Sequence, residues 1–232
     1  MQDGGINPRM PPVKPLRFSL IALLAPLLGG CFSIDQTLDA RNASEGVFEV
    51  RASVPASTIA AAQNVPGLGG RPFCADKNAA EKLGLTVTVD TFTEGENQIC
   101  VMTARGPMET IARVAADKSY LPKDAPPQAN ALSYLLEPAG SGVWTLTMTL
   151  VPPAEIRALS GNDDMTRAAQ TMIFGSLTGR GVNWAVEAVE ILESTGTVNP
   201  DRTRAEYQLP LQSILNNPQP EYRFVTRFRT AS

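Results

Sequence analysis

Histidine is absent from all 232 residues of the chain. Its absence excludes Ser-His-Asp and Cys-His catalysis, histidine-ligated zinc and the commonest general base at neutral pH. Carboxylates gather in local runs such as Glu187, Glu190 and Glu193, and one local segment cannot place its side chains around a substrate. We interpret that run as a solvated face. We therefore expect a protein that is not an enzyme, with no catalytic residue, metal ligand or cofactor.

Cysteine is also scarce, with three residues at positions 31, 74 and 100. Cys31 follows a short apolar run, residues 20–28, which is preceded by Lys14 and Arg17 and closed by two glycines. This order is typical of a bacterial signal peptide that ends in a lipobox, and it predicts that Cys31 becomes the first mature residue and carries lipid. A retained membrane-spanning helix is disfavoured, because such a helix needs about 20 apolar residues.

The signal divides the chain into a leader (1–30), a lipidated N-terminus with a polar tether (31–45) and one α+β domain (46–232). Residues 32–45 lack strong periodicity and reach less than about 50 Å when extended. The domain is therefore expected to work close to its membrane. Phe32 and Ser33 stand where enteric bacteria place a retaining aspartate, which predicts a cell-envelope protein at the periplasmic face of the outer membrane.

Cys74 and Cys100 remain as an even pair in a chain exported to an oxidising compartment, where paired cysteines usually form a disulfide. Such a bond would contribute about 3 kcal/mol of stability on the chain-entropy model. A metal site or a redox couple is the alternative, but metal sites need more ligands and redox couples usually show a C-x-x-C spacing. We therefore predict a structural bridge between Cys74 and Cys100.

Basic residues are slightly outnumbered in the mature chain. The first 30 residues carry three of the 20 basic and one of the 23 acidic residues, which leaves a net charge of −5 on the remaining 202. A mildly acidic body argues against nucleic acid as a partner.

Hydrophobic periodicity predicts antiparallel strands in hairpins with helices inserted after them, an α+β fold with a mainly antiparallel sheet and helices packed on one face. Strands are expected over residues 46–54, 85–92, 98–105, 131–137, 143–150, 202–211 and 222–229, and helices over residues 57–63, 76–83, 108–117, 153–159 and 162–177. Residues 182–192 fit a helix by composition and a strand by their first residues, so periodicity alone leaves them open.

Arginines form the most distinctive cluster near the C-terminus. In the predicted strands Arg202 and Arg204 share one face of the first, and Arg223, Arg227 and Arg229 share one face of the second. If the strands pair in a hairpin, five guanidinium groups lie together beside lipid headgroups, where each is worth about 1 kcal/mol near an anionic surface. We predict contact with anionic lipid or an acidic partner; the alternative is an ordinary exposed face balanced by nearby glutamates.

The order of elements resembles a family of bacterial envelope lipoproteins typified by the mycobacterial LppM domain. The matching places are an opening strand (47–54), a hairpin (85–105), a helix (108–117), a second hairpin (133–150) and the run 191–211, in which Thr195-Gly196 replaces the usual Asn-Gly. The resemblance implies a lipid-binding α+β domain without known catalytic residues, and it favours a strand over residues 182–189.

Two functions follow from these observations. The first is a membrane-anchored lipoprotein whose domain binds lipid or a hydrophobic ligand near the membrane. The alternative is an interaction module that scaffolds an envelope protein complex. In both, the N-terminal lipid attaches the chain to the membrane, and the further partner is an anionic lipid or an envelope protein.

Overall fold

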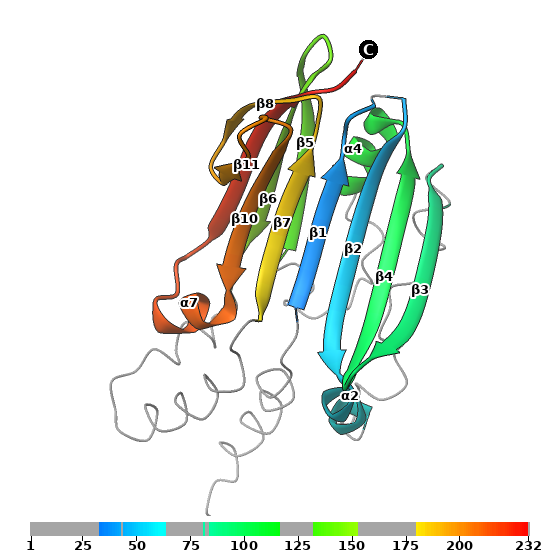
Figure 1. The fold of residues 1–232 in the computed structure, drawn as a ribbon, viewed down its shortest axis with the longest axis vertical. Coiled ribbons are helices and arrows are strands. Elements are labelled where there is room, and N and C mark those ends of the chain that lie inside the picture. Colours follow the sequence, from blue (N-terminus) through cyan, green and yellow to red (C-terminus); the bar gives the residue numbers. More distant parts are fainter. Residues whose placement is uncertain are drawn as a thin grey trace, which may run out of the picture.

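The computed structural model describes residues 33–42, 44–63, 81, 84–116, 132–152 and 180–231. In these ranges the chain forms two β-sheets and three short helices, with mostly antiparallel pairing (Figure 1). The predicted α+β class is therefore confirmed, and its strands divide between the two sheets. The helices predicted over residues 153–159 and 162–177 lie outside the described residues, as does the one over 76–83 except for Glu81.

The larger sheet has seven strands. Their spatial order is β3 (Thr86–Glu94), β4 (Asn97–Gly106), β2 (Gly46–Pro55), β1 (Ser33–Asp39), β7 (Gly181–Glu187), β10 (Arg204–Pro210) and β9 (Thr197–Val198). β1 and β7 run parallel, with Ile34 opposite Val182, and the other neighbours are antiparallel. The predicted hairpin over residues 85–105 is confirmed as β3 and β4.

The smaller sheet has four antiparallel strands. Their order is β5 (Leu132–Gly140), β6 (Val143–Leu150), β11 (Tyr222–Arg229) and β8 (Glu190–Ser194). β6 alternates as predicted, because Trp144, Leu146 and Met148 are buried while the intervening threonines are half-buried. β5 carries Pro138 next to a bulge at an edge of the sheet, where a missing N–H leaves no partner unsatisfied.

The core lies between the two sheets. Trp184 of β7 packs against Phe224 of β11 with ring centroids 6.3 Å apart, and Phe48 of β2 meets Tyr134 of β5 edge-to-face at 5.4 Å. Phe224 and Phe228 are 0 % exposed, as expected from their inward positions on β11. Burying one such side chain is worth about 1.5–3 kcal/mol, so this layer provides most of the force that joins the sheets.

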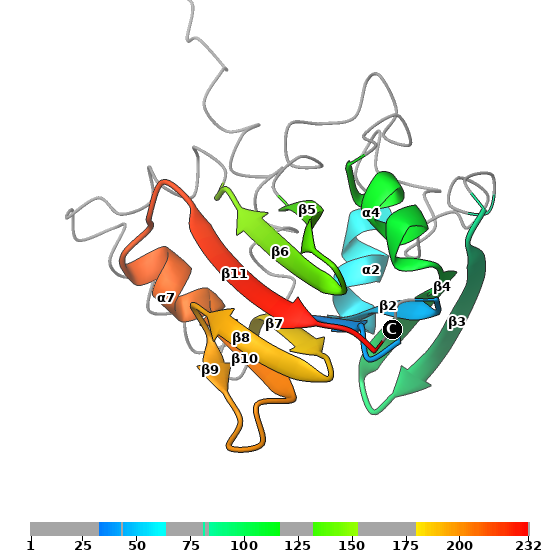
Figure 2. The ribbon, with the colours of Figure 1, turned by 90° about the horizontal axis from the view of Figure 1, so that it is seen from above.

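The helices are α2 (Ala56–Gln63), α4 (Met108–Ala116) and α7 (Leu211–Asn216). α4 packs beside β5 and buries Met108 and Ile111 (Figure 2). It approaches β2 so closely that a Cβ on Gly46 would lie 2.6 Å from the sulfur of Met108. Glycine at this position therefore lets the helix cover the sheet.

The predicted tether is wrong for residues 33–39. They form β1, a central strand that pairs with β2 on one side and β7 on the other. The described fold therefore starts at Ser33, although the sequence predicted a domain from residue 46. Ile34 and Leu38 do alternate with polar residues, but Gln36 takes the apolar position between them and masks the period of two.

The ambiguous run at residues 182–192 is extended, as the family resemblance implies. It forms β7 and then β8, which belong to different sheets, with Ala188 and Val189 between them. Ala188 is buried and its N–H donates to the carbonyl of Thr203 at 2.9 Å. One segment therefore contributes strands to two sheets, which explains why neither helical nor strand periodicity fits its whole length.

Candidate functional site

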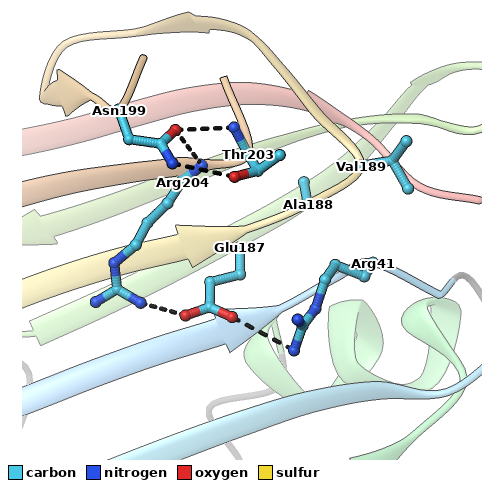
Figure 3. Close-up of a pocket in the computed structure, with 7 residues that line it drawn as sticks. All are labelled: Arg41, Glu187, Ala188, Val189, Asn199, Thr203 and Arg204. Carbon is cyan, nitrogen blue, oxygen red and sulfur yellow. Dashed lines mark hydrogen bonds and ion pairs between the residues drawn. The ribbon is translucent and has the colours of Figure 1, made fainter. Parts of the chain in front are cut away.

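The two ends of the seven-stranded sheet differ in chemistry. We call the end where β1 and β7 finish and β10 begins the charged end, and the end that carries α2 and α7 the helical end (Figure 1). A pocket of about 450 Å³ opens at the charged end, shown in Figure 3. Its lining residues are Arg41, Glu187, Ala188, Val189, Asn199, Thr203 and Arg204.

Asn199 shapes one wall of this pocket. Its side-chain oxygen accepts hydrogen bonds from the N–H groups of Thr203 at 2.8 Å and Arg204 at 2.9 Å, and its amide donates to the Thr203 hydroxyl at 3.0 Å. The Asn199 N–H also donates to the Arg204 carbonyl at 2.9 Å. An asparagine that bonds its own turn in this way holds the β9–β10 connection in one shape.

Ion pairs between Arg41, Glu187 and Arg204 line another part of the pocket. The Glu187 carboxylate lies between two guanidinium groups, those of Arg204 and of Arg41, the latter at 3.4 Å. Arg204 also pairs with Glu206, and Arg41 pairs with Asp39 through Nε at 2.9 Å. The network therefore ties together β1, β7 and β10 on the outer face of the sheet.

The network shifts the pKa values of several of its members, and Asp39 and Arg204 illustrate the two directions. The side-chain hydrogen bond from Arg41 lowers the pKa of Asp39 against the smaller opposing effect of burial. Burial by itself lowers the pKa of Arg204, but its hydrogen bonds and charge interactions with Glu206 and Glu187 outweigh burial and raise the pKa overall. Both groups are thus stabilised in their charged forms at neutral pH.

The chemistry of this pocket is that of a structural ion-pair cluster. Its lining residues offer one hydroxyl, on Thr203, and that hydroxyl already accepts a bond from Asn199. Its two guanidinium groups are occupied by carboxylates, so an anionic ligand would have to displace Glu187. Within the described ranges, no group of three or more Asp, Glu, His or Cys side chains is arranged to hold a metal ion.

A second feature lies inside the fold, between the sheets. Gln36 and Trp184 are opposite each other on β1 and β7, and both are nearly fully buried, at 3 % and 1 % exposure. The Gln36 amide donates to the Tyr134 hydroxyl of the other sheet. Among the residues that the structure describes, Gln36 Oε1 and Trp184 Nε1 have no hydrogen-bond partner.

Leaving a buried polar atom unsatisfied costs about 1–3 kcal/mol, so an open acceptor and an open donor on adjacent strands need an explanation. The surrounding side chains are apolar, because Trp184 stacks against Tyr207 at 5.7 Å and against Phe224. An open donor and an open acceptor beside aromatic rings match the polar part of an otherwise apolar ligand. We call Gln36 and Trp184 the interior polar pair.

The predicted arginine cluster is wrong in its geometry. Arg204 lies on β10 in the larger sheet, whereas Arg223, Arg227 and Arg229 lie on β11 in the smaller one. β10 pairs with β7 and β9, and β11 pairs with β6 and β8. The chain changes sheets through α7, so the two strands cannot close the short hairpin that the prediction required.

Arg202 has a different role from the one predicted. It precedes β10 in a turn, with a left-handed φ of 54°, and its guanidinium donates to the carbonyls of Ile191 at 2.5 Å and Leu192 at 2.6 Å. Its own carbonyl accepts the N–H of Ile191. Arg202 therefore fastens the turn of the larger sheet to β8 of the smaller one.

The three arginines of β11 do share the exposed face of that strand, as predicted. Each lies near a glutamate: Arg223 is 3.8 Å from Glu221, Arg229 is 3.6 Å from Glu190, and Arg227 is opposite Glu193 in the β-ladder. The glutamate run at residues 187–193 is thus matched to arginines on β10 and β11 and to Arg41, which follows β1. Contact of these arginines with anionic lipid stays a prediction.

Two predicted cysteine sites lie outside the described residues. Cys31 and Cys74 belong to ranges that the structure does not describe, whereas Cys100 is buried in β4 at 6 % exposure. Lipidation of Cys31 and the Cys74–Cys100 bridge therefore stay predictions.

Sequence reasoning missed Gln36, Asp39 and Arg41, because it assigned their segment to a tether. The available signal was the alternation from Ser33 to Asp39, in which every second residue is Ile, Gln or Leu. A single amide at a core position is enough to hide a strand from a search for apolar residues.

Comparisons with known proteins support the fold. No protein-family model matches the sequence, and no curated protein matches it. A search of solved structures finds the folded domain of LppM from Mycobacterium tuberculosis, with a TM-score of 0.51 and 10 % identity over 87 % of this chain and 91 % of that one. In the described residues, no helix is both long and apolar enough to cross a bilayer. The predicted resemblance is confirmed: this chain is similar in fold to the LppM domain.

Proposed function

We propose that this chain is a cell-envelope lipoprotein, anchored through Cys31, whose domain binds a lipid or another hydrophobic ligand next to the membrane. The lipobox before Cys31 supports the anchor, and the LppM-like fold supports an extracytoplasmic lipoprotein domain. The outer membrane is the membrane that Phe32 and Ser33 favour. A non-catalytic role is consistent with the absence of histidine and with a pocket whose charged groups are already paired.

The interior polar pair is the observation that carries ligand binding. Gln36 Oε1 and Trp184 Nε1 offer one acceptor and one donor inside an otherwise apolar layer. A lipid has the matching composition, since its ester and hydroxyl groups accept and donate hydrogen bonds while its chains fill apolar space. Binding would satisfy both atoms and bury further apolar surface in one step.

Trp184 provides the readout for this proposal. The chain has two tryptophans, so Trp144→Phe leaves Trp184 as the only indole. Titration of that variant with a monoacyl phospholipid below its micelle concentration is expected to shift the Trp184 emission and to saturate. Gln36→Leu in the same background should weaken binding about tenfold, because it removes a hydrogen-bonding group worth about 1.4 kcal/mol.

Glu49→Gln is a matched control, because Glu49 is exposed on β2, two strands from Trp184. An emission that does not change in any variant would contradict ligand binding between the sheets. Mass spectrometry of the chain purified from native membranes provides an independent test, with a co-purified lipid as the expected result. A stoichiometric envelope protein in place of lipid would instead favour the scaffold function, and nucleic acid is not an expected partner.

A further inference from the structure

We infer that, once Cys31 is lipidated, the domain docks on the phospholipid surface through its helical end. This inference rests on the anchoring part of the proposed function and adds the orientation of the domain and the surface it presents to the bilayer. It concerns the described residues at the start of β1, at the end of β2 with α2, and at the end of β10 with α7.

The length of chain between the lipid and the fold is the first argument. β1 begins at Ser33, two residues after Cys31, and two extended residues span at most about 7 Å. The start of β1 is therefore held at the level of the headgroups. Since β1 runs from Ser33 toward Asp39, its other end must point away from the membrane or along it.

The β-ladders place other elements at the same level as Ser33. Ser33 pairs with Ser53, two residues before the end of β2, after which α2 begins. On the other side, Gly181 starts β7 and pairs with Pro210, after which α7 begins. Figure 1 shows both helices at the end of the sheet where β1 starts, opposite the C-terminus.

The composition of the two ends is the second argument. α2 and α7, with the sequences ASTIAAAQ and LQSILN, contain no charged side chain. Phe92 near the end of β3 and Val151 after β6 expose apolar side chains at this level, at 43 % and 41 %. The nearby Glu94 is paired with Arg51 at 2.5 Å. Among the described residues, this level also carries the pair Arg223–Glu221 at 3.8 Å and the exposed Glu96 in the β3–β4 turn. Pairing of most of these charges reduces the number of unpaired charges that lose water when this end enters the headgroup region.

The charged end has the opposite composition. It gathers Asp39, Arg41, Glu187, Arg204 and Glu206, whose side chains remain partly exposed. Desolvating these charges against lipid would cost free energy that surface ion pairs do not return. The orientation that places Ser33 at the bilayer therefore also directs this cluster of charges away from the lipid.

Phe92 and Val189 make a matched pair of probe positions. Their exposures are similar, at 43 % and 48 %, but Phe92 lies at the helical end and Val189 follows β7 at the charged end. The seven residues of β7 separate these levels by about 20 Å. Phe92→Trp and Val189→Trp therefore report the two ends with one fluorophore.

The test uses the full-length lipidated protein in phosphatidylcholine vesicles that contain a phospholipid with a fluorescent energy acceptor on its headgroup. Transfer from Trp144 and Trp184 is subtracted with the unsubstituted protein. Because transfer falls steeply over about 20 Å, Phe92→Trp is expected to add at least about three times the transfer that Val189→Trp adds. Val151→Trp, which follows β6 at the helical end, should behave as Phe92→Trp does. It provides a second probe of this end in case the Phe92→Trp substitution disturbs β3.

Equal transfer from both ends, or more transfer from Val189→Trp, overturns the orientation. The strongest transfer from Val225→Trp, on the arginine face of β11, would show that the domain lies on that face and overturns it as well. In these cases flotation with the vesicles still supports the anchor, so the proposed function stands. A chain that carries no acyl group and does not float removes the anchor, and the orientation is overturned with it.

Discussion

The charged end and the helical end of the same sheet are stabilised by different forces. At the charged end, Asp39 lies opposite Glu187 on parallel strands, and Glu187 lies opposite Arg204. Two carboxylates facing each other repel, and Arg41 compensates by contacting both. The helical end instead closes the sheet with two uncharged helices. This difference underlies the proposed orientation, in which the charged end faces water and the helical end faces lipid.

Removing the lipid should have the largest effect, because it releases the helical end from the membrane. Cys31→Ser is expected to move the protein almost completely from the membrane fraction to the soluble fraction, because a chain with no acyl group loses its anchor. Its midpoint of thermal unfolding should stay the same as that of the unmodified domain, since residue 31 precedes β1. Membrane flotation and a melting curve measure both quantities, and a Cys31→Ser protein that still floats would contradict the anchor.

The stability of the whole fold, including both ends of the larger sheet, depends on the core between the two sheets. Phe224→Ala removes a fully buried ring that packs on Trp184 and Tyr207, and should lower the free energy of unfolding by about 3–5 kcal/mol. Phe92→Ala removes the same atoms from an exposed position and should cost less than about 1 kcal/mol. Urea unfolding measures the two values, and similar losses would show that the two sheets are not joined by this aromatic layer.

The predicted disulfide should stabilise the fold through β4, the strand between β3 and β2. Replacing both Cys74 and Cys100 by serine is expected to lower the free energy of unfolding by about 3 kcal/mol if the two are bridged. Thiol titration of exported, unreduced protein should then find neither thiol. Two titratable thiols, or a double variant as stable as the parent, would contradict the bridge.

The ion pairs of the charged end should contribute less. Arg204→Gln breaks contacts with Glu187 and Glu206, and is expected to lower the free energy of unfolding by no more than about 1 kcal/mol because the side chains are partly exposed. Arg223→Gln, whose distance to Glu221 is 3.8 Å, serves as a control with a smaller effect. A loss of several kcal/mol for Arg204→Gln would show that this end, and not the core, holds the strands together.

The smallest expected effect is a pH dependence at Asp39. Arg41 lowers the pKa of this carboxyl below its ordinary value of 3.8, so the folded state favours its charged form. The resulting stabilisation is complete above the unfolded pKa and is lost as the pH falls through the lower folded pKa. Asp39→Asn should therefore be less stable than the parent near neutral pH by under about 1 kcal/mol, and the difference should shrink below about pH 4. A difference that is constant from pH 7 to pH 3 would contradict the Arg41 contact.

Much of the secondary structure could be predicted because its patterns are local. Alternation in β6 and in the β3–β4 hairpin, and the apolar stripe of α4, depend on neighbouring residues alone. β1 was missed because its central place depends on β7, far along the chain, as well as on its neighbour β2, and the two strands together tolerate Gln36 at a core position. The pocket at the charged end could not be predicted either, since its residues come from three separate segments.

The arginines also show that local patterns predict a strand but not its partners. Their alternation on β11 was predictable, because a period of two is a property of one strand. The sheet to which each strand belongs was not, because α7 allows the chain to leave one sheet and enter the other. A hairpin was the natural expectation for two consecutive strands, and only the longer connection with its helix excludes it.

The sequence by itself determined the lipobox, the missing histidine, the alternation of most strands and the resemblance to the LppM fold, because each depends on residue types and local order. Only the tertiary structure decided that residues 33–39 form a central strand, that the five arginines divide between two sheets and a turn, and that Gln36 and Trp184 are neighbours on β1 and β7. These outcomes depend on which distant strands pair, and pairing is chosen by the burial of whole faces at once.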